Sequence, residues 1–137
     1  MHKYNSLRKP VFRFTDLEVY QKTMAASVII IKDLKAHLTE LAYPFVELIV
    51  NCAMNLPLQI SEAHSMRFGN HDHALELMEK AMANCNKMVV YLDQIRGIYG
   101  DKVSPDLLED LIRRYQDVRG KIFRLAKAWQ KFEPPKK

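Results

Sequence analysis

The chain has 137 residues, of which 48% are hydrophobic and 27% are charged, and its formal net charge is +5. This length predicts one domain, and the composition is that of a globular protein rather than a disordered one. The first residues lack the apolar segment of a secretory signal, and the longest apolar run is far too short to cross a bilayer. We therefore expect a cytoplasmic protein without a membrane partner.

A first helix is expected over residues 16–38. The segment TDLE at residues 15–18 has the pattern of a capping box, in which the Thr15 hydroxyl and the Glu18 carboxylate each accept from the other residue's N–H. Apolar residues then recur at steps of three and four, as on a helix with one buried face. The predicted core stripe comprises Leu17, Tyr20, Met24, Val28, Ile31, Leu34 and Leu38.

A second helix is expected over residues 44–68, opened by Pro44 and followed by a stop at Gly69. Its predicted core face comprises Phe45, Leu48, Ile49, Cys52, Leu56, Ile60 and Ala63. Pro57 lies in the interior, where a proline costs about 3 kcal/mol because it lacks an N–H and crowds the preceding turn. We expect a kink there, with packing on both sides of the helix to offset the lost hydrogen bond.

Two further helices are expected over residues 71–99 and 105–132. Asn70 can cap the first, whereas Ser104 and Pro105 provide a cap and a first-turn proline for the second. No segment alternates with the period of a strand, and the connections are short. The sequence therefore predicts an all-α fold, an antiparallel up-down four-helix bundle with a proline-kinked second helix.

The first two helices also carry a second apolar line beside the core stripe. A helix that is apolar on more than one face is usually covered by something else. That cover could be a second copy of the chain or another helix of the same bundle, and we favour the second copy. The predicted homo-oligomer interface comprises Val19, Ala26, Ile30, Val46, Val50, Ala53 and Pro57.

Three segments carry a family resemblance: LEVYQK at residues 17–22, LPLQISEA at 56–63 and RGKIFRLAKAW at 119–129. They resemble small four-helix-bundle proteins with two branches. One branch is encoded in intervening sequences of 23S ribosomal RNA genes, and the other comprises the Avd accessory variability determinants of diversity-generating retroelements. The resemblance covers about residues 14–132, between a basic extension at 1–14 and a basic tail at 133–137, and it includes Pro57. It implies a barrel-like homopentamer with a basic surface, which in the retroelement branch binds a reverse transcriptase and associates with template RNA or DNA.

The chain departs from both branches at individual positions. In the ribosomal branch two arginines commonly stand a turn before the motif proline, whereas here those places hold Val50 and Asn51. The retroelement branch tends to carry two arginines a turn apart on the third helix, and here the nearest candidates are Lys87 and Tyr91. Trp129, in contrast, fits the retroelement branch better. Since the sequence departs from both branches, the resemblance leaves the branch open.

Basic residues gather at the two ends of the chain and along the fourth helix. Several of those on the fourth helix share one face with Gly120, so they could follow the phosphates of a nucleic acid. The alternative is a basic face that contacts only solvent. A pentamer with +5 per chain would carry +25, and this charge could bind polyanions that one chain would hold weakly. The candidate residues for contact with nucleic acid or a protein partner are Arg8, Lys9, Arg13, Lys87, Arg113, Arg114, Arg119, Lys121, Arg124, Lys127 and Lys131.

Catalytic motifs are lacking in this sequence. Di-iron four-helix bundles use a Glu-x-x-His spacing, which does not occur here, and there is no nucleophile motif or Gly-rich phosphate loop. His64, His71, Asp72 and His73 gather near one turn with Glu62 and could hold zinc, but roles in the turn and caps are favoured. Cys52 and Cys85 form no CxxC motif and are expected to be buried free thiols.

We therefore predict a non-catalytic basic accessory protein, with no cofactor or metal, that binds nucleic acid, a reverse transcriptase or both. The alternative is a structural homo-oligomeric scaffold without affinity for nucleic acid.

Overall fold

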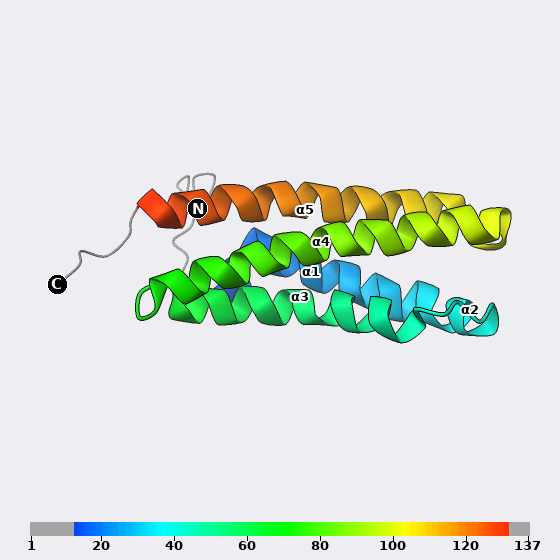
Figure 1. Cartoon of the computed structure of the whole chain (residues 1–137), viewed down its shortest axis with the longest axis horizontal. Helices are drawn as coiled ribbons and strands as arrows, with labels where there is room; N and C mark the ends of the chain where they lie inside the picture. The colour runs from blue at the N-terminus through cyan, green and yellow to red at the C-terminus, as the bar shows by residue number, and fades with distance from the viewer. Residues whose placement is uncertain (1–12, 132–137) are drawn as a thin grey trace, which may run out of the picture.

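The computed structural model describes residues 13–131. Its elements are the 3-10 turn η2 (Phe14–Asp16), α1 (Glu18–Ile29), the π-helical segment η3 (Ile30–Leu34), α2 (Lys35–Glu40), α3 (Val46–Met66), α4 (His71–Tyr99), the 3-10 turn η4 (Gly100–Lys102) and α5 (Pro105–Lys131). No strand occurs in the described part of the chain, which confirms the predicted all-α fold. Because α1, η3 and α2 follow one another without interruption, they form one long rod beside α3, α4 and α5 (Figure 1).

The four rods pack as a bundle with successive rods antiparallel (Figure 1). α1 packs against α3 and α5, and α4 packs against the same two helices. The apolar faces of all four rods therefore enclose one continuous core, in which side chains such as Ile30, Leu56 and Tyr115 are fully buried. None of the helices described is long and apolar enough to span a bilayer.

The predicted caps of α4 and α5 are confirmed. The Asn70 side chain accepts a hydrogen bond from the His73 N–H at 3.4 Å. The Ser104 hydroxyl oxygen accepts from the Leu107 N–H at 3.2 Å. Each cap satisfies one of the backbone donors that a helix leaves free in its first turn.

The predicted capping box at Thr15 is wrong. Thr15 lies inside η2, and α1 begins three residues later at Glu18, after an extended Leu17 without a side-chain cap. The Asp16 carboxylate instead accepts a hydrogen bond from the Arg13 N–H at 3.3 Å. A one-turn 3-10 helix thus replaces the first turn that the sequence pattern predicted for α1.

The core face of α1 also differs from the prediction. Met24, Val28 and Ile31, expected in the core, are 39%, 43% and 37% exposed. The cause is η3, because a π-helical turn accommodates one extra residue. One residue corresponds to about 100° of helix rotation, so the segment before η3 turns a different face to the core than an unbroken α-helix would.

The residues predicted as an oligomer interface lie inside the bundle. In α1, Val19, Ala26 and Ile30 are 3%, 2% and 0% exposed, since they occupy the face that η3 turns inward. In α3, Val50, Ala53 and Pro57 are also buried, and Val46 is half-buried. The interface prediction is therefore wrong for the six buried residues, because neighbouring helices of the same chain cover them. α3 itself continues through Pro57 as one element.

Candidate nucleic-acid interface

The charges of α5 divide the helix into two halves. Residues 105–117 contain four acids and two arginines, whereas residues 118–131 contain five cations and no acid. We call residues 118–131 the cationic segment; its cations are Arg119, Lys121, Arg124, Lys127 and Lys131. Lys131 lies in the last turn of α5, where a cation interacts favourably with the carboxyl end of the helix.

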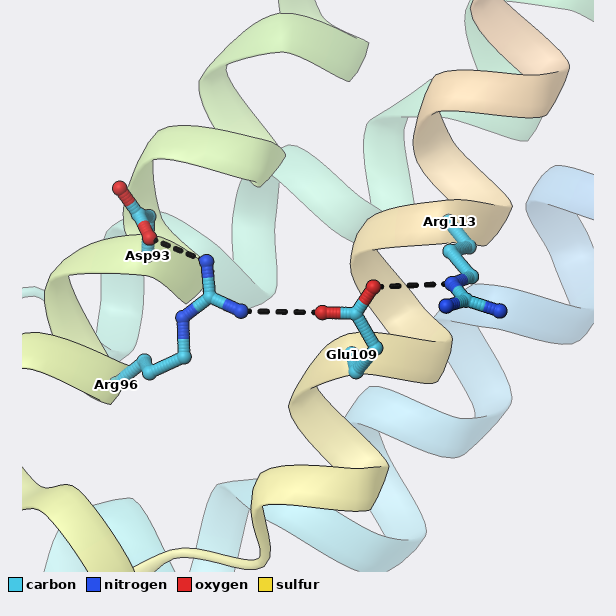
Figure 2. Close-up of polar contacts among 4 residues, drawn as sticks. All are labelled: Asp93, Arg96, Glu109 and Arg113. Atoms are coloured by element: carbon cyan, nitrogen blue, oxygen red, sulfur yellow. Dashed lines mark hydrogen bonds and ion pairs between the residues drawn. The ribbon is translucent and has the colours of Figure 1, made fainter.

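In the first half of α5 the arginines are ion-paired. The Arg113 Nε lies 2.9 Å from a Glu109 oxygen, and the other Glu109 oxygen lies 3.1 Å from Nη1 of Arg96 on α4. Arg96 also contacts Asp93 at 2.7 Å, so these four residues form one chain of charges between α4 and α5 (Figure 2). The hydrogen bond from Arg113, together with Arg96, lowers the pKa of Glu109.

Arg114 is paired in the same way, with its Nε 2.8 Å from Asp110. Because local carboxylates compensate both Arg113 and Arg114, these two predicted site residues contribute little net positive charge to their surroundings. The structure thus separates them from the cations that follow on the same helix.

A second set of ion pairs joins α5 to α1. Lys121 Nζ lies 3.4 Å from the Glu18 carboxylate, and Lys22 lies 3.8 Å from Glu18 and 3.7 Å from Asp117. The side of α5 that faces α1 therefore alternates cations and acids. Lys121 belongs to this network and is only partly available to a ligand.

The other four cations of the cationic segment form no ion pair within residues 13–131. Arg119, Arg124, Lys127 and Lys131 are all exposed. A Cβ added to Gly120 would lie 3.6 Å from Arg124 Nη1, so the group that approaches Gly120 is the guanidinium of Arg124. Charged groups held at the surface without compensating acids are those that a polyanion can neutralise.

An exposed aromatic ring lies among these cations. Phe123 is 47% exposed, and Lys127 Nζ lies 5.5 Å from the centroid of its ring. Trp129 follows two residues after Lys127 and is half-buried. Of these three residues, only Phe123 and Lys127, one turn apart, share a face of α5. A cation beside an exposed aromatic ring is typical of surfaces that bind single-stranded nucleic acids, where phosphates meet the cations and bases stack on the rings.

The other residues predicted to contact nucleic acid do not all lie near the cationic segment of α5. Lys87 lies close enough to Cys52 of α3 to oppose the rise that burial causes in the pKa of that thiol, which places Lys87 toward α3. Arg13 is exposed just before η2. Arg8 and Lys9 lie outside the described residues. The structure therefore concentrates the candidate interface on the second half of α5.

The histidines near the turn between α3 and α4 have separate partners. His71 Nδ1 lies 3.2 Å from the Arg67 carbonyl oxygen, His73 Nδ1 lies 3.2 Å from Glu76, and His64 is buried with its ring centroid 6.4 Å from that of Trp129. Over residues 13–131 no three His, Cys, Asp or Glu side chains converge in a way that could hold a metal ion.

Sequence reasoning missed a cavity at this end of the bundle. Arg67, Phe68, His71 and Trp129 line it, and its volume is about 210 Å³. The only available signal was the presence of Trp129 within the cationic segment, because the other three residues lie on a distant turn that only the fold brings near.

Exposed apolar side chains gather on a different part of the molecule. Met24 and Val28 of α1 share one face with Ile31 of η3, and Leu48, Met54 and Leu58 are 50–65% exposed on α3. α1 and α3 pack side by side, whereas α5 is flanked by α1 and α4. The apolar surface and the cationic segment are therefore carried mainly by different sides of the bundle.

Comparisons with known proteins add no relative. A scan of protein-family models, a search of the curated proteins and a search of the solved structures found no match for this chain. The functional argument therefore rests on the residues and their arrangement.

Proposed function

We propose that this chain is a non-catalytic nucleic-acid-binding protein that contacts phosphates through the cationic segment of α5. The observation that carries the proposal is that Arg119, Arg124, Lys127 and Lys131 are exposed and have no ion pair among the described residues, in a half-helix that contains no acid. Neutralising phosphates with such cations releases condensed counterions, which drives binding with little dependence on sequence.

The length of the cationic segment suits a nucleic-acid backbone. From Arg119 to Lys131 an α-helix rises about 18 Å. At about 3.4 Å per phosphate along one strand, this length corresponds to roughly five phosphates. Arg124 and Lys131 are two turns apart on one face, so a strand running along α5 would meet them in succession.

The resemblance to the intervening-sequence and Avd family supports an accessory role in the same proposal. We propose that its partner is a reverse transcriptase, or the nucleic acid that this enzyme copies, as for an Avd-like protein.

We also propose a homo-oligomer, with a pentamer favoured, whose interface lies on the exposed apolar residues of α1 and α3 rather than on the buried ones. In this proposal Pro57 bends α3 so that it follows a curved interface.

The direct test removes three cations from α5. In the triple variant Arg124→Ala, Lys127→Ala, Lys131→Ala, we expect affinity for a fluorescently labelled structured RNA to fall by about tenfold or more at low salt. Fluorescence anisotropy gives the affinity. Because the three side chains are exposed, the fold should be retained, which circular dichroism checks.

A matched control removes the same charge elsewhere. Lys32, Lys35 and Lys102 are exposed and lie at the other end of the bundle, where His37 of α2 contacts the Lys102 carbonyl. Replacing these three by alanine should change RNA affinity by no more than about twofold, given the screening of distant charges. Equal losses in the two triple variants would show that net charge, and not the cationic segment, determines binding.

A homo-oligomeric scaffold without nucleic-acid binding is the second candidate function. The exposed apolar residues of α1 and α3 favour it, because such side chains on neighbouring helices are typical of protein contacts. The scaffold predicts no association with RNA even at low salt, and this result would replace the first proposal.

A further inference from the structure

The cavity at the end of the bundle is built from aromatic and basic side chains. Trp129 of α5 and Phe68, which follows α3, line it together with Arg67 and His71. Its volume of about 210 Å³ is below the roughly 300–1,000 Å³ of pockets that hold drug-sized ligands. The cavity therefore suits a single planar ring system rather than a larger molecule.

Both aromatic rings are held in place by neighbours. The Arg67 guanidinium carbon lies 4.4 Å from the centroid of the Phe68 ring, and its Nη1 donates to the His64 carbonyl at 2.6 Å. The Trp129 ring packs near the His64 ring, which is 6% exposed. Phe68 is nevertheless 70% exposed, so most of its side chain is accessible to solvent at the cavity.

One side chain that lines the cavity also has a ring nitrogen without a hydrogen-bond partner among the described residues. A carbonyl can only accept, so the contact of His71 Nδ1 with the Arg67 carbonyl makes Nδ1 the donor. In the neutral ring Nε2 is then an acceptor, and it is buried without a hydrogen-bond partner in the described part of the molecule. Because this atom has almost no accessible surface, a ligand N–H could reach it only after the His71 ring rotates, so the acceptor is not part of the open cavity.

The position of the cavity relates it to the cationic segment. Trp129 lies between Lys127 and Lys131 in the sequence, but two residues correspond to about 200° of helix rotation, so the Trp129 ring and these cations lie on opposite sides of the last turns of α5. A strand that meets both would pass around this end of α5. A ligand that joins planar rings to regularly spaced negative charges matches this combination. Nucleic acids do so, and single strands expose their bases for stacking on aromatic side chains.

We propose that this cavity takes one unstacked base of a single-stranded nucleic acid whose phosphates lie on the cationic segment. The base stacks on Trp129 and Phe68, and Arg67 adds a cation at the edge of the site. This inference rests on the proposed function, and it specifies the ligand as single-stranded rather than duplex.

Trp129 provides the readout, because it is the only tryptophan of the chain. The full chain is titrated at low salt with a short oligoadenylate and with an abasic strand of the same length. We expect the oligoadenylate to quench Trp129 fluorescence and to bind about tenfold more tightly than the abasic strand, as stacking of one base predicts. The abasic strand should bind through its phosphates without quenching.

Two phenylalanine variants at opposite ends of α3 locate the effect. Phe68→Ala should remove most of the difference in affinity between the two strands. Phe45→Ala removes a partly exposed ring at the other end of the helix and should preserve the difference.

The outcomes separate the two proposals. Equal binding of both strands with unchanged Trp129 fluorescence would overturn the base site and leave the cationic segment as the binding surface. Failure of the two strands alone to bind would also overturn the base site, whereas failure of both strands and of the structured RNA to bind would overturn the proposed function itself.

Discussion

Arg113 and Arg124 lie on the same face of α5 and carry the same charge, but their surroundings differ. Glu109 is one turn before Arg113 and accepts from it, whereas the residue one turn before Arg124 is Gly120. The carboxylate compensates the first arginine, and the glycine leaves the second free to rest against the backbone. This contrast of single residues determines which cations of α5 remain available to a polyanion.

His64 should make the stability of the fold depend on pH. Burial and the charge of Arg67 lower the pKa of His64 below its ordinary value of 6.5, and Asp16 opposes them only in part. Below pH 6.5 the unfolded chain binds a proton that the folded chain does not, so stability is complete above this pH and falls as the pH decreases toward the folded-state value. The limiting slope is about 1.4 kcal/mol per pH unit.

Urea unfolding measures this dependence when the free energy of unfolding is determined at a series of pH values, from neutral pH down to the pH at which carboxylates begin to titrate. The variant His64→Phe keeps a ring beside Trp129 but cannot titrate, so its free energy of unfolding should vary less over the same range. An identical dependence on pH in the two proteins would contradict the assignment to His64.

At the scale of the elements, α4 and α5 were predictable and the irregular first rod was not. α4 and α5 keep the α-helical period from end to end, and Asn70 and Ser104 mark where they begin. The segment IIKDL of η3 contains neither Pro nor Gly that would indicate a π-helical turn. For this reason the inward face of α1 was wrong, although the existence of the helix was right. The prediction was also wrong at the start of α3, where Phe45 and Leu48, expected in the core, are 40% and 50% exposed.

The ion pairs between helices could not be predicted from the sequence either. The contacts of Arg96 with Glu109 and of Lys121 with Glu18 join residues whose proximity depends on how neighbouring helices are aligned along their lengths. A helical period identifies faces but not this alignment. The pairs of Arg113 with Glu109 and of Arg114 with Asp110 follow the helical spacing of the sequence, but the pairs that join α5 to α4 and α1 emerged only from the fold.

Deleting one residue tests the role of η3. Deletion of Ile31 should convert the π-helical turn to regular α-helix while Ile30 and Leu34 keep facing the core, so cooperative thermal unfolding should persist with a midpoint within several degrees of wild type. Deletion of the exposed Asn86 from the regular helix α4 should rotate one half of that helix by about 100° relative to the other and abolish cooperative unfolding. Comparable damage from both deletions would show that η3 does not absorb the change.

At the scale of the whole molecule, the two proposed surfaces do not compete. The cationic segment belongs to α5, and the proposed interface residues Met24, Val28, Leu48, Met54 and Leu58 lie on α1 and α3. Subunits could therefore associate through the apolar residues while each α5 cationic segment stays accessible. In a pentamer the net charges of the subunits would combine, which strengthens attraction of a polyanion beyond that of one chain.

Light scattering coupled to size exclusion tests this assembly. We expect a mass near 80 kDa, five times the 16.0 kDa of one chain. The double variant Val28→Glu, Leu58→Glu places two charges in the apolar surface and should reduce the mass to that of a monomer. The control Asn86→Glu, Gln116→Glu adds the same charges at exposed polar positions of α4 and α5 and should leave the mass unchanged. A wild-type chain that elutes at 16.0 kDa would contradict the oligomer.

The salt dependence of RNA binding tests the central claim most directly. For a single strand, each phosphate contact contributes about 0.7 to the slope of log affinity against log salt. If Arg124, Lys127 and Lys131 each contact a phosphate, replacing all three by alanine should lower the magnitude of the slope by about 2 relative to wild type. Equal slopes in the two proteins would show that these cations do not meet the phosphates, and binding by the cationic segment of α5 would be contradicted.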